Sequence, residues 1–204
     1  MIRRLGLPYL ALAFTAVLLV FAGHSSVFAA ADWDPLEGVN RLASWFRTLT
    51  ANFDRVVETE KRGQLIRAVD KLRKELYLLE VDTRFLLESI SDRQPTPPEH
   101  DRLEESARDL LNTVRRLTSR LREVGADLRL ADRSEERAVE ERLAYGLRTR
   151  FLVVTFVEER LQAVKSGSER WAPDALRAHL RRGLEAVRNA QLAATEFQAK
   201  LVRE

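Results

Sequence analysis

The chain has 204 residues, of which 34 are Lys or Arg and 31 are Asp or Glu, and it contains no cysteine. The absence of cysteine excludes disulfides, thiolate metal sites, iron–sulfur clusters, c-type haem attachment and a lipid-modified cysteine anchor. Two of the arginines, Arg3 and Arg4, lie in the first 31 residues; without them the chain is close to neutral, so its charge does not indicate nucleic-acid binding.

The first 31 residues have the pattern of a secretion signal peptide. The positive charges of Arg3 and Arg4 precede an apolar stretch over Tyr9–Ala22, and the small residues Ala29–Ala31 offer a cleavage site. We therefore expect a signal peptide at 1–31 and export of the remaining chain to the periplasm or another part of the cell envelope.

An uncleaved anchor is the alternative to a signal peptide. Residues 5–23 form an apolar stretch of about one membrane span, which would hold the protein in the inner membrane. In both cases residues 32–204 form the exported part. Their length corresponds to one domain that is large enough to bury its own core.

Two helices are expected in the first half of this domain. Asp34, Pro35 and Glu37 suit the first turn of the first helix. A turn or kink near 59–63 separates it from a second helix at about 64–91. The apolar positions of the second helix alternate between spacings of four and three, which is typical of a helix that faces partner helices. These positions are Leu65, Val69, Leu72, Leu76, Leu79, Thr83, Leu86 and Ile90.

The third helix begins after a proline-rich loop. Thr96, Pro97 and Glu99 supply a capping residue, a first-turn proline and an acid at the third position. Its apolar stripe keeps the same spacing to residue 131, although Gly125 is expected to thin the helix or end it early. The stripe consists of Leu103, Ala107, Leu110, Val114, Leu117, Leu121, Val124, Leu128 and Ala131.

Two further helices complete the domain. The fourth is expected at about 134–165, and its middle, 151–157, is apolar on nearly all sides. The fifth begins at Pro173 and continues almost to the C-terminus. Because the connections are short, neighbouring helices are expected to be antiparallel. The sequence thus predicts an all-α, elongated, antiparallel up-and-down bundle of about five helices, with a four-helix core and an N-terminal helix that packs in the bundle or projects as an arm.

Arginines recur every seven residues along the third helix, outside its apolar stripe, at Arg108, Arg115, Arg122 and Arg129. The helical rise places these residues, which we call the arginine row, about 10 Å apart. Such a row is a candidate surface for an acidic partner, an anionic lipid or an anionic polymer. The alternative is a solvated face with local ion pairs such as Glu104–Arg108, which the acids interspersed along the helix favour.

Trp33 is a second candidate contact residue. It precedes the first helix, and Gly38 offers it no apolar partner one turn further on. An exposed tryptophan is typical of membrane surfaces and protein interfaces. The alternative is packing of the indole over one end of the bundle.

Thr83, Arg150 and Glu158 are candidates for an internal polar pocket. Thr83 interrupts the apolar stripe of the second helix, and Glu158 lies beside the stripe of the fourth. Ligand sites in helical bundles are built from inward polar groups of this kind. The alternative for Thr83 is a hydrogen bond from its hydroxyl to its own helix backbone.

The sequence lacks the patterns of common catalytic and metal sites. It has no G-x-S-x-G, no H-E-x-x-H and no glycine-rich phosphate loop, and neither His100 nor His179 completes a Glu-x-x-His pair. The acid pairs Glu135-Glu136 and Glu140-Glu141 are expected on exposed helix faces, where neighbouring side chains diverge. We therefore expect no cofactor, no metal and no enzyme activity.

These patterns together indicate a non-enzymatic, exported helical bundle that acts through protein–protein or surface contacts, as a scaffold, an adaptor or a chaperone-like envelope component. The expected partner is another envelope protein or a second copy of the chain, with no nucleic acid. Membrane contact is expected only through an uncleaved signal segment or Trp33. The alternative is a bundle that binds or senses a small molecule in an internal polar pocket.

Overall fold

The computed structural model describes residues 37–130, 132–148, 166, 171 and 173–204, and these belong to one compact unit spanning Asp34–Glu204. Every regular element within these residues is helical, so the prediction of an all-α fold is confirmed for them. None of the described helices combines the length and apolarity needed to cross a membrane. The elements are α2 (Glu37–Ala51), α3 (Phe53–Val56), the 3₁₀ turn η1 (Thr59–Lys61), α4 (Arg62–Ser89), α5 (Pro97–Ala126), α6 (Ser134–Arg148) and α8 (Pro173–Arg203).

Several sequence predictions concern residues outside the described part. They are the signal peptide at 1–31, the anchor at 5–23, Trp33, the first-turn residues Asp34 and Pro35, Ala131, and the second half of the fourth helix with Arg150, 151–157 and Glu158.

Local signals set most of the helix boundaries. The expected turn near 59–63 lies between the end of α3 at Val56 and the start of α4 at Arg62. At the start of α5, the Thr96 N–H donates a hydrogen bond to Glu99 Oε2 at 2.7 Å. This bond is the largest contribution that lowers the pKa of Glu99, as expected for a carboxylate that caps a helix N-terminus.

The helix α5 ends before its apolar stripe does. The stripe was expected to continue to residue 131, but the helix ends at Ala126, and Leu128 is buried beyond it. The chain then turns back toward α6, whose first residue, Ser134, donates its N–H to Asp132 Oδ1 at 2.9 Å. An apolar residue can therefore keep its place in the core after the helix has ended.

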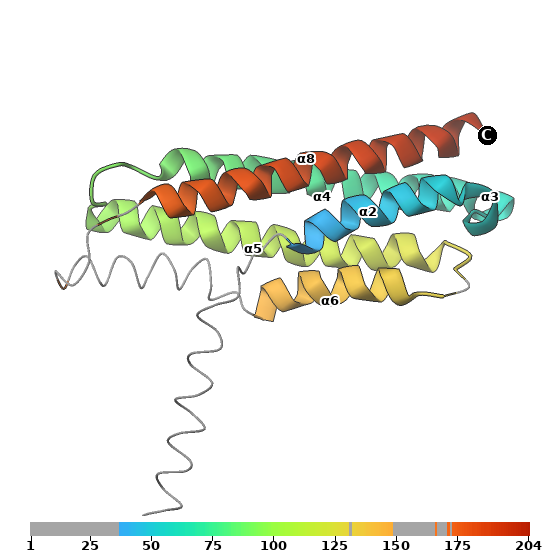
Figure 1. The fold of residues 1–204 in the computed structure, drawn as a ribbon, viewed down its shortest axis with the longest axis horizontal. Coiled ribbons are helices and arrows are strands. Elements are labelled where there is room, and N and C mark those ends of the chain that lie inside the picture. The colour runs from blue at the N-terminus through green and yellow to red at the C-terminus, as the bar shows by residue number, and fades with distance from the viewer. Residues whose placement is uncertain (1–36, 131, 149–165, 167–170, 172) are drawn as a thin grey trace, which may run out of the picture. The chain divides into compact units, whose positions relative to one another are not determined.

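The described helices form a closed ring, in the order α2, α8, α4, α5, α6 and back to α2 (Figure 1). Neighbours run antiparallel except α2 and α8, whose C-terminal ends meet, as shown by the Phe46 and Phe197 rings at 5.8 Å. A ring of five members cannot alternate in direction all the way round, so one pair must be parallel. This pair is not joined by a short connection, so it lies outside the expectation of antiparallel neighbours, which concerned helices that follow each other in the chain.

The first predicted helix packs within the ring and does not project as an arm. α2 lies between α8 and α6. Gly38 lies so close to α6 that a Cβ there would be 2.9 Å from the Leu143 backbone nitrogen. Because backbone cannot move aside as a side-chain tip can, glycine is what permits this approach.

The core contains the predicted stripes. All eight positions predicted for the second helix are buried, from Leu65 in α4 to Ile90 just beyond its end. The described positions of the α5 stripe are buried as well. At the end where α2 and α8 meet, Phe197 lies against Phe53 at 6.1 Å as well as Phe46. Val56, the last residue of α3, is only half-buried.

Replacing Phe197 by alanine is expected to lower the free energy of unfolding by about 3–5 kcal/mol, because it leaves a cavity among aromatic rings. Urea unfolding followed by circular dichroism measures the change. Leu192→Ala is the matched control on the same helix: its side chain is 58% exposed, and the expected change is within about 0.5 kcal/mol. Equal effects of the two substitutions would contradict the packing described here.

Candidate functional site

Three members of the arginine row lie on the exposed side of α5, and the fourth, Arg129, is exposed beyond the end of that helix. Two of the four are paired with acids of the protein. Arg108 pairs with Glu104 one turn earlier, the local pair expected from the sequence. Arg122 Nε donates to Glu140 Oε1 on α6 at 2.7 Å, and this bond raises the pKa of Arg122.

The other two members of the row make weaker or backbone contacts. Arg115 Nη1 lies 3.4 Å from Asn112 Oδ1. The backbone N–H of Arg129 donates to Val56 O at 2.9 Å, which fastens the α5–α6 connection to the end of α3. The ion pairs of Arg108 and Arg122 reduce the charge that the row offers to an anionic ligand, whereas the bond of Arg129 involves only its backbone.

Thr83 is fully buried, and its hydroxyl donates to Leu79 O at 2.6 Å. This is the local backbone bond that was the alternative to a pocket role. Arg150 and Glu158, the other two residues proposed for the internal pocket, lie outside the described residues. The pocket predicted from Thr83, Arg150 and Glu158 is therefore not seen in the described part of the chain.

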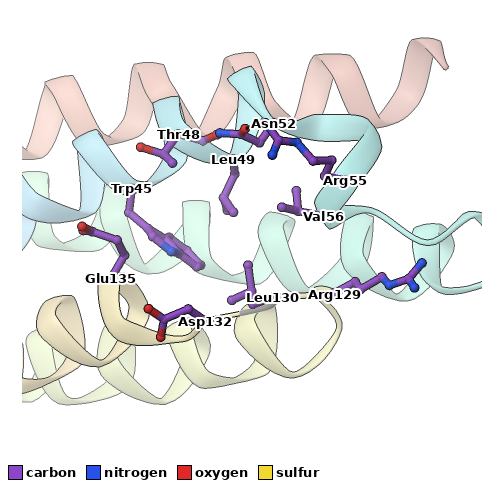
Figure 2. Close-up of a pocket in the computed structure, with 10 residues that line it drawn as sticks. All are labelled: Trp45, Thr48, Leu49, Asn52, Arg55, Val56, Arg129, Leu130, Asp132 and Glu135. Carbon is purple, nitrogen blue, oxygen red and sulfur yellow. Dashed lines mark hydrogen bonds between the residues drawn. The ribbon is translucent and has the colours of Figure 1, made fainter.

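A cavity of about 250 Å³ lies between α2–α3 and the α5–α6 connection (Figure 2). Trp45, Leu49, Val56 and Leu130 supply its apolar wall. Polar groups at its rim are engaged with the protein: Asn52 Nδ2 donates to Thr48 O at 2.9 Å, and Arg55 Nη2 donates to Asn52 Oδ1 at 3.0 Å. The other lining residues are Arg129, Asp132 and Glu135. Its volume falls just below the usual range for small-molecule sites, about 300–1,000 Å³.

A second hollow of about 570 Å³ lies along the border of α4 and α5. Three carboxylates, Glu99, Glu105 and Asp109, and one guanidinium, Arg102, surround the exposed ring of Phe85. The hollow is a surface groove with an excess of negative charge. Ser89 and Ser106 complete its lining.

A polar network joins α4 to α5, and sequence reasoning missed it. Glu75, which is largely buried, accepts a hydrogen bond from Arg116 Nε at 2.9 Å. Arg116 also donates to Thr113 Oγ1 at 2.7 Å, and the Thr113 hydroxyl donates to Asp82 Oδ2 at 2.5 Å. The signal was available, because Glu75 and Asp82 flank the α4 stripe seven residues apart, where helix pairs place register-setting polar groups.

Glu136 is a buried acid that was expected on an exposed face. Its side chain lies over Gly125 of α5, where a Cβ would overlap the carboxylate. Oε2 is buried without a hydrogen-bond partner among the described atoms. Burial is the largest cause that raises the pKa of Glu136; Arg133 and Arg137 lower it, and Glu140 adds to the rise. Gly125, which leaves room for the carboxylate, was the only sign of this burial in the sequence. The spacing of residues along the chain does not show which side chain of the next helix lies over this glycine.

Replacing Glu136 by glutamine is expected to raise the free energy of unfolding at pH 7 by about 1 kcal/mol. The raised pKa means that the native state binds this proton more tightly than the unfolded state does. The destabilisation by the charged form is therefore present above the native pKa and is lost as the pH falls below the ordinary value of 4.5. Urea unfolding from pH 4 to pH 8 should show the advantage of the variant shrinking toward acid pH.

Glu141→Gln, at an exposed position of α6, is the control for this measurement and should show no such trend. A constant difference between Glu136→Gln and the wild type over the whole pH range would contradict the described environment of Glu136.

The outer face of α4 exposes four large apolar side chains: Tyr77, Leu78, Val81 and Phe85. Tyr77 is 62% and Phe85 is 60% exposed. These residues, which we call the α4 outer face, lie on the side of the helix opposite its buried stripe. Single exposed apolar residues are ordinary, but a cluster within about two helical turns is typical of a contact surface.

Comparison with protein-family models, with curated proteins and with solved structures finds no match to this chain. Within the described residues, no group of three or more His, Asp or Glu side chains is placed to hold a metal ion.

Proposed function

We propose that this protein is an exported, non-enzymatic helical bundle that works by binding another protein surface, and that the α4 outer face is the contact surface. The observation that carries the proposal is the exposure of Tyr77, Leu78, Val81 and Phe85 on one side of a helix whose opposite side is fully buried. Aromatic residues are enriched at the centres of protein interfaces. A scaffold, adaptor or chaperone-like role in the cell envelope follows from such a surface on a rigid bundle.

The polar surroundings of the α4 outer face also support binding. Toward α8, Glu80 accepts hydrogen bonds from Arg84 at 2.6 Å and from Arg188 at 3.1 Å. Near the N-terminal end of the face, Lys74 lies 3.0 Å from Asp70. An apolar centre with charged residues at its margin is the usual anatomy of a reversible protein interface.

The cell-envelope location is supported by the sequence of residues 1–31, with its positive start, apolar stretch and small residues at Ala29–Ala31. The exported protein is expected to begin near Asp32. Fractionation of cells, followed by mass determination of the intact protein, tests this expectation. An intact N-terminus in the membrane fraction would instead support the anchor at 5–23, and recovery in the cytoplasm would contradict export.

Small-molecule binding is the second candidate function, and the cavity beside Trp45 is the observation that favours it. Its wall is apolar and includes the indole of Trp45 (Figure 2). Its small volume and its engaged rim groups make it the weaker candidate. Quenching of Trp45 fluorescence by a ligand would favour this function.

Site-specific photo-cross-linking in the cell tests the contact surface. A photoreactive phenylalanine analogue at Phe85 or Tyr77 is expected to give a discrete cross-linked product, because both side chains are exposed at the centre of the proposed surface. Tyr145 is the matched control: it is an exposed aromatic residue on α6, which does not neighbour α4 in the described ring. Equal cross-linking from Tyr145, or none from α4, would contradict the proposed function.

A further inference from the structure

The exposed side of α4 has a sequence that is symmetric about Val81. Along this side the residues are Lys74, Tyr77, Val81, Phe85 and Glu88, at spacings of three, four, four and three. Their types are charged, aromatic, aliphatic, aromatic and charged, and the two charges have opposite signs. All five side chains are exposed, and the helical period places them on one face.

A two-fold axis through Val81, perpendicular to α4, would use this symmetry directly. The axis places α4 of a second copy antiparallel to the first, so that each residue lies opposite the one equally distant on the other side of Val81. Tyr77 then faces Phe85 of the second copy. Lys74 faces Glu88 of the second copy, and because the interface is isologous this ion pair occurs twice.

We propose that the partner of the α4 outer face is a second copy of this chain, bound antiparallel about Val81. This inference rests on the proposed function and names the partner at the same surface. The aromatic pairs supply the apolar centre of the interface, and the two Lys74–Glu88 pairs close its ends.

Charge complementarity selects the antiparallel arrangement. A parallel pair of α4 helices in register would place Lys74 opposite Lys74 and Glu88 opposite Glu88, which is repulsive at both ends. In the antiparallel arrangement both ends are attractive. Lys74 already lies 3.0 Å from Asp70 of its own helix, so Glu88 of the second copy would add a second acid to that lysine.

Leu78 and Arg84 lie on opposite edges of the outer face, so each flanks the proposed interface, and Arg84 there keeps its bond to Glu80 at 2.6 Å. One helix face from each copy buries less than the roughly 1,600 Å² of a standard interface. An interface below the standard size is typical of reversible complexes.

Charge reversal tests the pairing of Lys74 with Glu88. Lys74→Glu alone and Glu88→Lys alone each place like charges at both ends, and each should weaken dimerisation about tenfold in sedimentation equilibrium. An equimolar mixture of the two variants should form heterodimers with the wild-type affinity. In the heterodimer both acids of the Lys74→Glu variant lie opposite the two lysines of the Glu88→Lys variant. Because both positions are exposed, the fold is expected to stay unchanged, which circular dichroism checks. Failure of the mixture to recover affinity would overturn the antiparallel pairing.

Single cysteines test the position of the axis, and any cross-link is unambiguous because the chain has no cysteine of its own. Val81→Cys lies on the axis, so oxidation should give a disulfide-linked dimer. Tyr77→Cys should give none alone but should link to Phe85→Cys when the two variants are mixed. Self-linking of Tyr77→Cys would indicate a parallel pair and would overturn the proposal.

The photo-cross-linked product from Phe85 separates failure of this inference from failure of the proposed function. A product with twice the mass of the chain supports both. A product with a different protein supports the contact function and overturns self-association. No product overturns the contact surface, and a protein that stays monomeric at all concentrations overturns the dimer alone.

Discussion

Each of the five helices in the ring buries one apolar stripe between its two neighbouring helices. This burial determines which of the remaining sides face a neighbour and which face away from the ring. On α4 the stripe from Leu65 to Ile90 points into the ring. The positions beside it are polar and bridge to the neighbours, with Glu75 and Asp82 toward α5 and Glu80 toward α8. Only the side away from the ring is then left, and there the sequence places aromatic residues that the ring does not use.

Two buried acids show how differently the helix contacts are stabilised. Glu75 lies between α4 and α5 with Arg116 Nε at 2.9 Å and Arg120 Nε at 3.9 Å, so its charge is compensated. Glu136 lies between α6 and α5 with a buried oxygen that has no partner among the described atoms. Leaving a buried polar group without a partner costs about 1–3 kcal/mol. The α5–α6 contact therefore carries this cost at Glu136, while the bond from Arg122 to Glu140 stabilises the same contact.

The sequence predicted what depends on local spacing and missed what depends on which helices meet. The stripe of α4 and the cap at Thr96 follow from residues within a few turns of each other, so both could be read in advance. An apolar stripe indicates that a helix packs against other helices but does not indicate which ones. The order of helices in the ring and the parallel α2–α8 pair were therefore not predictable. Glu136 was misplaced for the same reason, because its burial depends on Gly125 of another helix.

The α4 outer face was also readable in principle, since Tyr77, Val81 and Phe85 recur at a helical spacing of four. It was overlooked because a regular buried stripe on the same helix accounts for most of the apolar residues. Once the ring fixes which side of α4 faces outward, these residues no longer have a role in the core. Their exposure keeps apolar surface in water, a cost that folding does not require and that binding would relieve. Charged pairs such as Asp70–Lys74 and Glu80–Arg84 lie beside them, so polar groups border the exposed apolar side chains.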